Sequence, residues 1–304
     1  MKARRLFGPE VLGSEAVSHC QMPTPLILED RVRVFVSSRD DKGRSRAYAV
    51  DLDRDDFGSV LAVAGPVLDL GQPGHFDEHG TMPSSAVVLP DGRIRLYYVG
   101  WNRGTGSARY RVSIGSAISD DGLYFGREFD GPLLDRARDE PILATTPCVK
   151  AVAEGYEMTY CSGTRWIDDG GHSEPCYRVA TATSVDGVEW RRFGGVDLPL
   201  ASEAVTRPTI VEVNGRRMLA CSHRGSVGYR DDPRKGYKLA LLEESVDGWS
   251  LVTDNYRPLG DGEWCEIMRC YGHVVELGGS LMLLYNGDGF GASGVIAAPL
   301  ILGE

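Results

Sequence analysis

A strand-opening motif recurs five times along the chain at a nearly constant interval. Four copies place a proline at the head of an apolar run, and the fifth has a tyrosine there: Pro23, Pro83, Pro147, Pro208 and Tyr271. The steps between these positions are 60, 64, 61 and 63 residues. Because a regular period of this kind is typical of solenoids and propellers, it constrains the fold more than any other feature.

Each copy reads as a series of strands joined by tight turns. A second apolar run follows the first, as in "RIRLYYVGW" and "LMLLYNGDG", and the turns between them contain "PDG", "AEG", "VNG" or "GG". Such turns favour β-hairpins. A third strand leads in three copies to a Ser-x-Asp-Gly turn before an aromatic fourth strand; these turns begin at Ser119, Ser184 and Ser245. We therefore expect a four-stranded antiparallel blade from each copy.

The two ends of the chain complement each other. The last copy stops after its third strand, in "GVIAAPLILGE", whereas "KARRLFGPEVL" near the N-terminus belongs to no copy. We expect the N-terminal strand to complete the last blade, since this pairing would hide two open strand edges. The predicted fold is an all-β, five-bladed β-propeller that forms a single domain over residues 1–304. A β-sandwich with fortuitous repeats is the alternative.

Charge and composition exclude several classes of function. The formal net charge is −10, which argues against binding of nucleic acid or of an anionic membrane surface. The basic N-terminus is followed by no apolar stretch of the kind found in secretory signals. The seven cysteines include no C-x-x-C pair, which indicates reduced thiols. We expect a cytoplasmic protein, and the sequence carries no signal for its oligomeric state.

Four copies carry an acidic residue shortly before the first strand, at intervals of 63 residues: Asp77, Glu140, Glu203 and Glu266. In a propeller, the loops that enter the first strands cluster at one mouth of the central channel. Crowded carboxylates raise one another's pKa, so one can be neutral beside an ionised partner. Such a pair cleaves glycosidic bonds. The pattern predicts that these four residues are catalytic, although each one alone is equally compatible with capping a turn.

Other residues near the same mouth are candidate sugar-binding groups. Tryptophan can stack on the apolar face of a sugar, with packing between blades as the alternative, and arginine can hold a phosphate through two hydrogen bonds. The predicted substrate-binding residues are His19, Gln21, His79, Trp101, Trp166, Arg207, Arg224 and Trp264.

Metal binding has weak support in the sequence. Four histidines, His19, His79, His223 and His273, are candidates to approach the axis, where a structural cation such as calcium is a minor alternative. A lone histidine is more often a structural residue than a ligand, and no spacing matches a zinc motif. No cofactor and no metal ligand are therefore predicted.

The chain resembles the glycosidase-like propellers of glycoside hydrolase families 43, 62, 32 and 68, and is most similar to an uncharacterised cytoplasmic group. Runs that carry the resemblance include "HCQMPTPL", "FDEHGTMPSS", "YYVGWN", "EPILATTP" and "EAVTRP". By position, the resemblance implies Asp77 as base or nucleophile, Glu140 as pKa modulator and Glu203 as general acid. The first-blade acid of the classical families is missing near residues 19–21, so either the functional blades are rotated by one or Glu266 replaces it.

Three functions follow from these patterns. The leading hypothesis is hydrolase-type processing of a small intracellular glycoside or activated sugar, with the axial carboxylates as acid and base. The second is a phosphate-dependent phosphorylase or a glycosyl transferase, because basic residues near the mouth can hold phosphate: Arg103, Arg109, Arg165, Arg207, Arg224 and Arg230. The third is a non-catalytic sugar-binding propeller. In each case the expected partner is a small carbohydrate.

Overall fold

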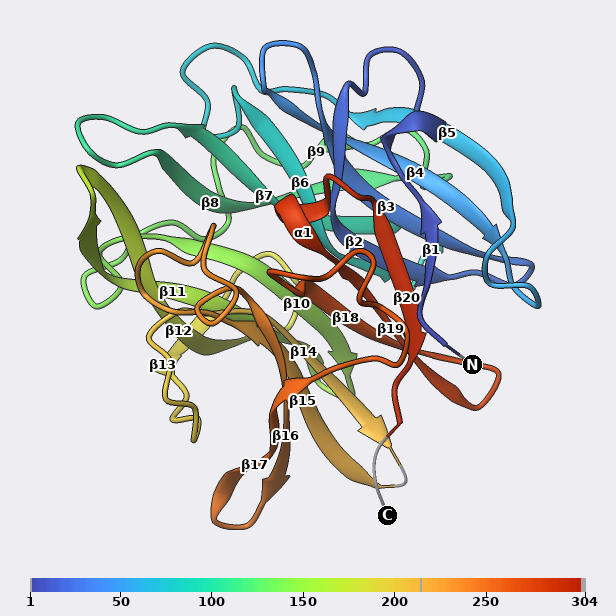
Figure 1. Cartoon of the computed structure of the whole chain (residues 1–304). Helices are drawn as coiled ribbons and strands as arrows, with labels where there is room; N and C mark the ends of the chain where they lie inside the picture. Colours follow the sequence, from blue (N-terminus) through green and yellow to red (C-terminus); the bar gives the residue numbers. More distant parts are fainter. Residues whose placement is uncertain (1, 214, 302–304) are drawn as a thin grey trace.

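A computed structural model of the chain describes residues 2–213 and 215–301. Its regular structure consists of twenty β-strands, the 3-10 helix η1 (Pro9–Val11) and the one-turn helix α1 (Asp288–Gly291). The described chain is therefore all-β, which confirms the predicted class (Figure 1). The part of the chain that the structure describes contains no helix that is long and apolar enough to cross a membrane.

Consecutive strands pair into antiparallel sheets of four. The first sheet contains β2 (Ser18–Ile27), β3 (Arg31–Arg39), β4 (Ser45–Asp53) and β5 (Val60–Leu68). The second contains β6 (Gly80–Val88), β7 (Ile94–Arg103), β8 (Tyr110–Ser119) and β9 (Gly126–Arg127). One bridge, between Ser45 and Gly80, connects these two sheets into an eight-stranded one.

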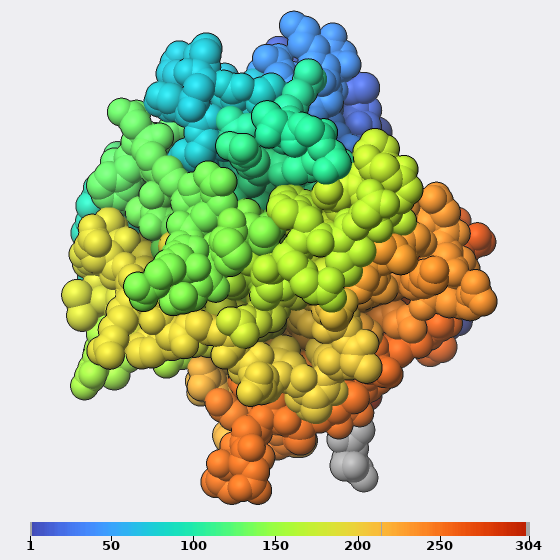
Figure 2. Space-filling view, turned by 90° about the vertical axis from the view of Figure 1, so that its left-hand side faces the viewer, coloured from blue at the N-terminus to red at the C-terminus, as the bar shows by residue number. Residues whose placement is uncertain are grey.

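The third and fourth sheets are separate and follow the same order. The third contains β10 (Ala144–Val152), β11 (Gly155–Asp169), β12 (His172–Ser184) and β13 (Arg191–Gly195). The fourth contains β14 (Val205–Val213), β15 (Arg216–His223), β16 (Lys238–Ser245) and β17 (Gly248–Tyr256). Figure 2 shows the hairpin of β16 and β17, in orange, standing out at the lower edge of the molecule.

The last sheet joins the two ends of the chain. It contains β18 (Cys270–Leu277), β19 (Ser280–Asn286), β20 (Val295–Pro299) and β1 (Arg4–Phe7). β1 runs antiparallel to β20, with Arg4 opposite Ala297 and Arg5 opposite Ile296. The N-terminal strand thus completes the last sheet, as the sequence predicts (Figure 1).

The sheets pack around a closed ring. The first strands contact one another in the order β2, β6, β10, β14 and β18, and β18 contacts β2 again. Five apolar clusters each join side chains of two neighbouring sheets. One of them unites the first and last sheets, with Val34 of β3 and Leu284 of β19 both fully buried. The core is therefore divided among the interfaces between sheets, and burial at each interface stabilises the ring.

Repeated side chains also link neighbouring sheets. Arg33 of β3 and Arg95 of β7 occupy equivalent positions in "RVRVFVSSR" and "RIRLYYVGW". Arg33 donates to the carbonyl of Asp121 and Arg95 to that of Asp186, each in the Ser-x-Asp-Gly turn of the following sheet. Each turn is itself held by its own serine and aspartate, beginning at Ser119 and Ser184. The recurring turn sequence therefore contributes to docking one sheet on the next.

Each first strand is distorted at the recurring motif. The pairing with the second strand shifts register there in all five sheets. Four residues at these shifts have positive φ angles of 46° to 57°: Met22, Thr146, Arg207 and Tyr271. Such a backbone costs on the order of 1–3 kcal/mol for a residue other than glycine, and strained residues of this kind cluster at functional sites. The register shifts and the strained residues therefore lie together on the first strands, which form the ring.

Candidate functional site

A cavity of about 310 Å³ lies where the five first strands enter the ring. Every first strand contributes to its lining, through Met22, Met82, Thr146, Thr206 and Tyr271. Three of these residues, Met22, Thr146 and Tyr271, are among those with positive φ. We call this space the axial cavity, because side chains from all sheets converge on it.

Aromatic side chains form much of the cavity lining. They are Trp101, Tyr110, Tyr177, Tyr229, Tyr237, Tyr271 and Phe290. The indole of Trp101 is oriented by a 2.6 Å hydrogen bond from its Nε1 to Ser45 Oγ. Since aromatic faces pack against the apolar faces of sugar rings, this lining suits a carbohydrate.

Arg224 contacts three of the lining tyrosines but does not itself line the cavity. Its guanidinium carbon lies 3.8 Å from the centre of the Tyr229 ring, and its Nε donates to the hydroxyls of Tyr177 and Tyr237. The side chain is buried and is not part of the cavity lining. The sequence predicted Arg224 as a substrate-binding residue; the structure instead indicates a positioning role, because its donors face protein groups.

Three arginines reach the cavity: Arg39, Arg109 and Arg230. We call them the arginine cluster. Arg109 lies 3.4 Å and Arg230 lies 3.0 Å from the same oxygen, Oε1 of the buried Glu174. The other oxygen of Glu174 accepts a 2.8 Å hydrogen bond from Tyr229. Glu174 is thus a shared counter-ion behind the lining rather than a lining residue.

Arg39 differs from its two neighbours. Its Nε donates to Gln21 Oε1 at 3.2 Å, and no carboxylate of the described residues lies within ion-pair distance of it. Burial lowers the pKa of Arg39, and the positive charge of Arg230 lowers it further. Two cations, Arg39 and Arg230, therefore line the same cavity, and among the described residues only Arg230 of the two pairs with a carboxylate.

Arg207 closes the channel beneath the cavity. Its side chain is fully buried and donates to Pro23 O and Thr24 Oγ1 of β2, and to Ser84 Oγ of β6. It also contacts the Nδ1 of His273 on β18 at 3.1 Å. Burial lowers its pKa to about 10, so it still carries a charge at neutral pH. Arg207 was predicted to contact substrate, whereas here it links the first strands of several sheets.

A second cavity, of about 350 Å³, lies at the other ends of the first strands. It is lined by residues such as Pro25, Ser85, Val149, Glu212 and His273. Arg207 and the motif residues therefore separate two spaces along one axis. The second space is lined by the ion pair of Lys150 with Glu212. Among its described lining residues, the imidazole of His273 is the only aromatic ring.

Two of the predicted catalytic acids are buried within their own sheets. Asp77 Oδ2 accepts hydrogen bonds from Tyr98 of β7 at 2.9 Å and from Arg127 of β9 at 2.8 Å. Glu140 likewise accepts from Tyr160 of β11 at 2.7 Å and pairs with a fourth-strand arginine, Arg192, at 3.3 Å. Each carboxylate therefore turns toward the second and fourth strands of its sheet, away from the axis.

The last sheet has a related arrangement with a different acid, in which the arginine precedes the first strand instead of lying on the fourth. Asp261 forms a bidentate pair with Arg269 at 2.6 and 2.9 Å and accepts a hydrogen bond from Tyr285 of β19. Asp261, and not Glu266, is therefore the counterpart of Asp77 and Glu140. We call these three residues with their tyrosine and arginine partners the buried acid sites.

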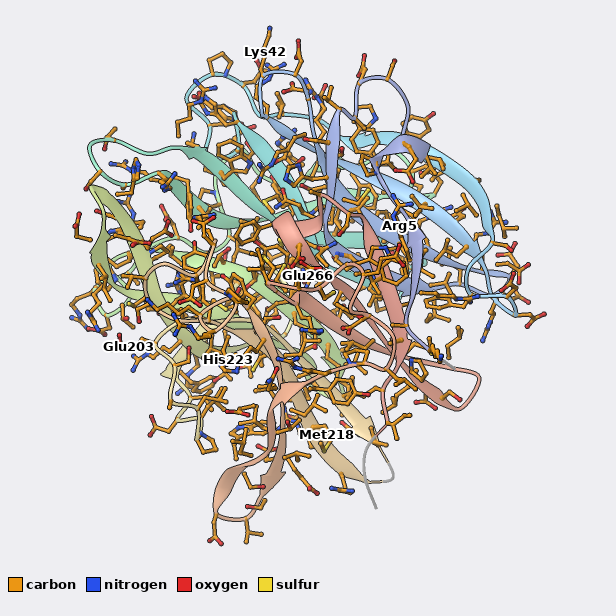
Figure 3. The ribbon with its side chains drawn as sticks, viewed as in Figure 1. Arg5, Lys42, Glu203, Met218, His223 and Glu266 are labelled. Atoms are coloured by element: carbon orange, nitrogen blue, oxygen red, sulfur yellow. The ribbon has the colours of Figure 1, made fainter. Side chains whose placement is uncertain are left out.

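The remaining predicted acids are exposed. Glu203 pairs with Arg165, and both side chains are more than half exposed. The second strand of this sheet, "RRMLACSH", has no tyrosine that could hold an acid. Glu266 is also exposed, and its backbone N–H donates to Asp288. Figure 3 shows Glu203 near the left edge and Glu266 near the middle of the molecule, well apart.

This arrangement corrects the expectation that the acids meet at one mouth. Among the described residues that line the axial cavity there is no aspartate or glutamate, so Asp77, Glu140, Glu203 and Glu266 are all absent from it. Their recurrence at intervals of 63 residues has a packing cause in two sheets, where a tyrosine of the second strand binds the acid. Their catalytic roles stay predictions.

The predicted binding residues divide into two groups. Gln21 and Trp101 line the axial cavity. The others lie outside its described lining: His19, His79, Trp166, Arg207, Arg224 and Trp264. His79 contacts Glu78 and the ring of Trp101, and Trp264 packs beside the core between the fourth and fifth sheets.

The candidate histidines do not form a metal site. His19 bonds to Ser18, His223 to the carbonyl of Asp254, and His273 to Arg207. The part of the chain that the structure describes contains no group of three or more histidine, cysteine, aspartate or glutamate residues placed to hold a metal ion. At the axis, the guanidinium of Arg207 already contacts a carbonyl and two hydroxyls that could serve a hard cation. These residues do not fit calcium.

Sequence reasoning missed several residues at the cavity, notably Arg39, Tyr229 and Glu174. One signal for Arg39 was available. Aligning "RVRVFVSSR" with "RIRLYYVGW" places Arg39 near Trp101 in the repeat, so both end a second strand at the same mouth. Tyr229 and Arg230 belong to a long loop between β15 and β16, which follows no repeat.

Comparison with solved structures relates the fold to glycoside hydrolases. The chain matches the RGII complex of BT0996 with a TM-score of 0.74 at 16% identity, covering 99% of this chain and 92% of that one. It matches a thermostable family-43 glycoside hydrolase with a TM-score of 0.65 at 13% identity, covering 93% and 89%. The Bombyx mori GH32 β-fructofuranosidase BmSUC1 gives 0.64 at 15% identity, covering 97% and 65%.

No protein-family model matches the chain. Two Mycobacterium tuberculosis proteins, the uncharacterized proteins MT1551 and Rv1502, are each 31% identical to it over 305 residues, which cover 98% of both chains. The structure neighbours share the glycosidase-like propeller fold expected from the sequence. The chain therefore belongs to the family of these two mycobacterial proteins and has a glycosidase-like propeller fold.

Proposed function

We propose that this chain is a glycoside-processing protein that binds a small sugar derivative in the axial cavity. The observation that carries the proposal is the lining, which combines aromatic faces with arginine and hydroxyl donors at the mouth of the ring. A volume of about 310 Å³ is at the lower end of the range for small-molecule sites, which favours a small ligand. The likeness of the fold to glycoside hydrolases adds general support.

We further infer that the five groups of four strands are the blades of one five-bladed β-propeller, and that they form a single domain. The closed ring of first strands and the five interfaces between sheets support this inference. A single cooperative unfolding transition in urea, seen alike by tryptophan fluorescence and circular dichroism, is the expected result.

The chemistry at the cavity favours binding or transfer over hydrolysis by two lining carboxylates. Hydrolysis of a glycoside usually needs one carboxyl group as acid and another as base or nucleophile. The described lining contains neither, and Glu174 is held behind it by Arg109, Arg230 and Tyr229. The arginine cluster favours a phosphorylase or transferase as the second candidate function. Phosphate-dependent turnover of nitrophenyl glycosides would distinguish this candidate from hydrolysis.

Two tryptophans offer a matched test of the binding site. Both Trp101 and Trp166 were predicted to contact sugar, but only Trp101 lines the axial cavity. Loss of one stacking ring typically removes about 0.5–1.5 kcal/mol beyond the area that it buries. We therefore expect Trp101→Ala to weaken binding of a hit from a sugar and sugar-phosphate panel by roughly tenfold, whereas Trp166→Ala leaves it unchanged.

Isothermal titration calorimetry on the full chain measures both variants. Equal losses for the two variants would place the ligand elsewhere. Failure of the wild-type protein to bind any member of the panel would reject the carbohydrate proposal itself.

A further inference from the structure

The charge of the axial cavity is unusual for this chain. The whole sequence has a formal charge of −10, yet the described cavity lining includes three arginines and no carboxylate. Among the described residues Glu174 is the single acid paired with the cluster, so the four groups together carry a net charge of two positive units, three minus one. A local excess of this sign attracts anions.

Arg39 is the least compensated member of the cluster. Its side chain is partly buried, its hydrogen-bond partner Gln21 is neutral, and Arg230 repels it. A buried charge is costly unless an opposite charge and hydrogen bonds accompany it. A bound anion would supply both to Arg39.

The floor of the cavity adds to the same potential. Arg207, at the recurring motif of β14, is fully buried and pairs with no carboxylate of the described chain. Its neighbour His273 is neutral, because burial and the charge of Arg207 hold the pKa of His273 well below its ordinary value. Arg224, behind Tyr229, contributes a further positive charge without a carboxylate partner among the described residues.

We propose that the arginine cluster is an anion subsite, so that the ligand of the axial cavity is a sugar that carries a phosphate or carboxylate group. Guanidinium groups bind both through paired hydrogen bonds of similar geometry. The anionic group contacts Arg39 and Arg230, and the uncharged sugar ring packs against Trp101 of the same lining. This inference rests on the carbohydrate-binding function proposed above.

The test compares each sugar with its charged derivatives. Glucose, galactose and mannose are titrated into the full chain as neutral sugars, as 6-phosphates and as uronates, with inorganic phosphate alone as a further probe. We expect a charged form to bind at least about tenfold more tightly than its neutral parent in roughly 50 mM salt, and this advantage to shrink at about 500 mM salt. Preference for the phosphate or for the uronate identifies which anion the subsite takes.

Charge-matched variants assign the effect to the cluster. Arg39→Gln removes the advantage of the charged form, and Arg109→Gln, at a side chain that is 42% exposed, lowers it. Arg93→Gln is the control, because it removes the same charge at the hairpin between β6 and β7, where Arg93 pairs with Asp91. This control keeps the wild-type advantage.

The two proposals fail in different ways. Binding of neutral and charged sugars with equal affinity, dependent on Trp101, would overturn the anion subsite and leave the carbohydrate site intact. The same loss in Arg39→Gln and Arg93→Gln would also overturn it, because the effect would then come from net charge. Absence of binding by every probe would overturn both.

Discussion

The buried acid sites and the axial cavity use the same residue types to opposite effect. In each acid site one carboxylate contacts one tyrosine and one arginine, as Asp261 does with Tyr285 and Arg269. In the described lining of the cavity there are arginines and tyrosines but no carboxylate, and the hydrogen-bond partner of Arg39 in the described chain, Gln21, is neutral. The first arrangement is closed and holds a sheet together, whereas the second leaves charge available for a ligand.

The buried acid sites and the axial cavity also differ in whether their residues recur from one copy to the next. The acid recurs with its tyrosine in the second, third and fifth sheets, while the second strand of the first sheet has no tyrosine. In the fourth sheet the acid lacks a tyrosine and is exposed. Features that recur with the period therefore reflect packing within each sheet. The candidate site, in contrast, is built from residues that differ between copies.

The largest expected effect is on the buried acid sites. Asp261→Asn leaves the buried guanidinium of Arg269 without its counter-ion. Removing one partner of a buried pair typically costs about 3–5 kcal/mol, so we expect a loss of that size in the free energy of unfolding measured in urea.

Asp77→Asn tests whether Asp77 stabilises its sheet, as the buried acid sites suggest, or acts as a catalytic base or nucleophile. We expect a clear loss of stability, since Tyr98 and Arg127 both bind its carboxylate. If Asp77→Asn instead keeps full stability and abolishes turnover of a glycoside, Asp77 is catalytic and the packing explanation of the acid is wrong.

A smaller change probes the tyrosine alone. Tyr160→Phe removes the hydroxyl that donates to Glu140 and leaves the ring in the core. A buried acceptor that loses a donor typically costs about 1–3 kcal/mol. We expect that range for the fall in unfolding free energy, and Tyr156→Phe, a change to another buried tyrosine of the same cluster that does not bind Glu140, serves as its control.

Burial of His273 beside Arg207 makes the stability of the protein depend on pH. The pKa of His273 is lowered well below 6.5, first by burial and then by Arg207, whereas in the unfolded chain it returns to its ordinary value. As the pH falls below about 6.5, the unfolded state takes up a proton that the folded state excludes, so stability decreases. His273→Gln should reduce the change in the urea midpoint between about pH 7 and pH 5; an unchanged slope would contradict this.

The smallest effect is expected at the exposed acid. Glu203 and Arg165 form an ion pair with both side chains more than half exposed. Exposed pairs of this kind contribute little to stability, so Glu203→Gln should leave the urea midpoint almost unchanged. A loss as large as that of Asp261→Asn would remove the distinction between buried and exposed acids.

Much of the fold could be predicted from the sequence because it depends on local patterns. The hairpin turns, the Ser-x-Asp-Gly turns and the unpaired strand near the N-terminus each predict contacts that the structure contains. Gln21 and Trp101, two of the residues predicted near the mouth, line the axial cavity, whereas His19 and Trp166 do not. The directions of the acids could not be predicted in this way.

The sequence by itself determined the period, the strands of each copy and the way in which the ends close the ring. Only the tertiary structure decided which side chains meet. A register shift changes the face on which a side chain lies, and every first strand contains such a shift beside the motif. Arg39 and Arg230 share a cavity because the ring brings the first sheet beside a loop of the fourth, a proximity that no local pattern encodes.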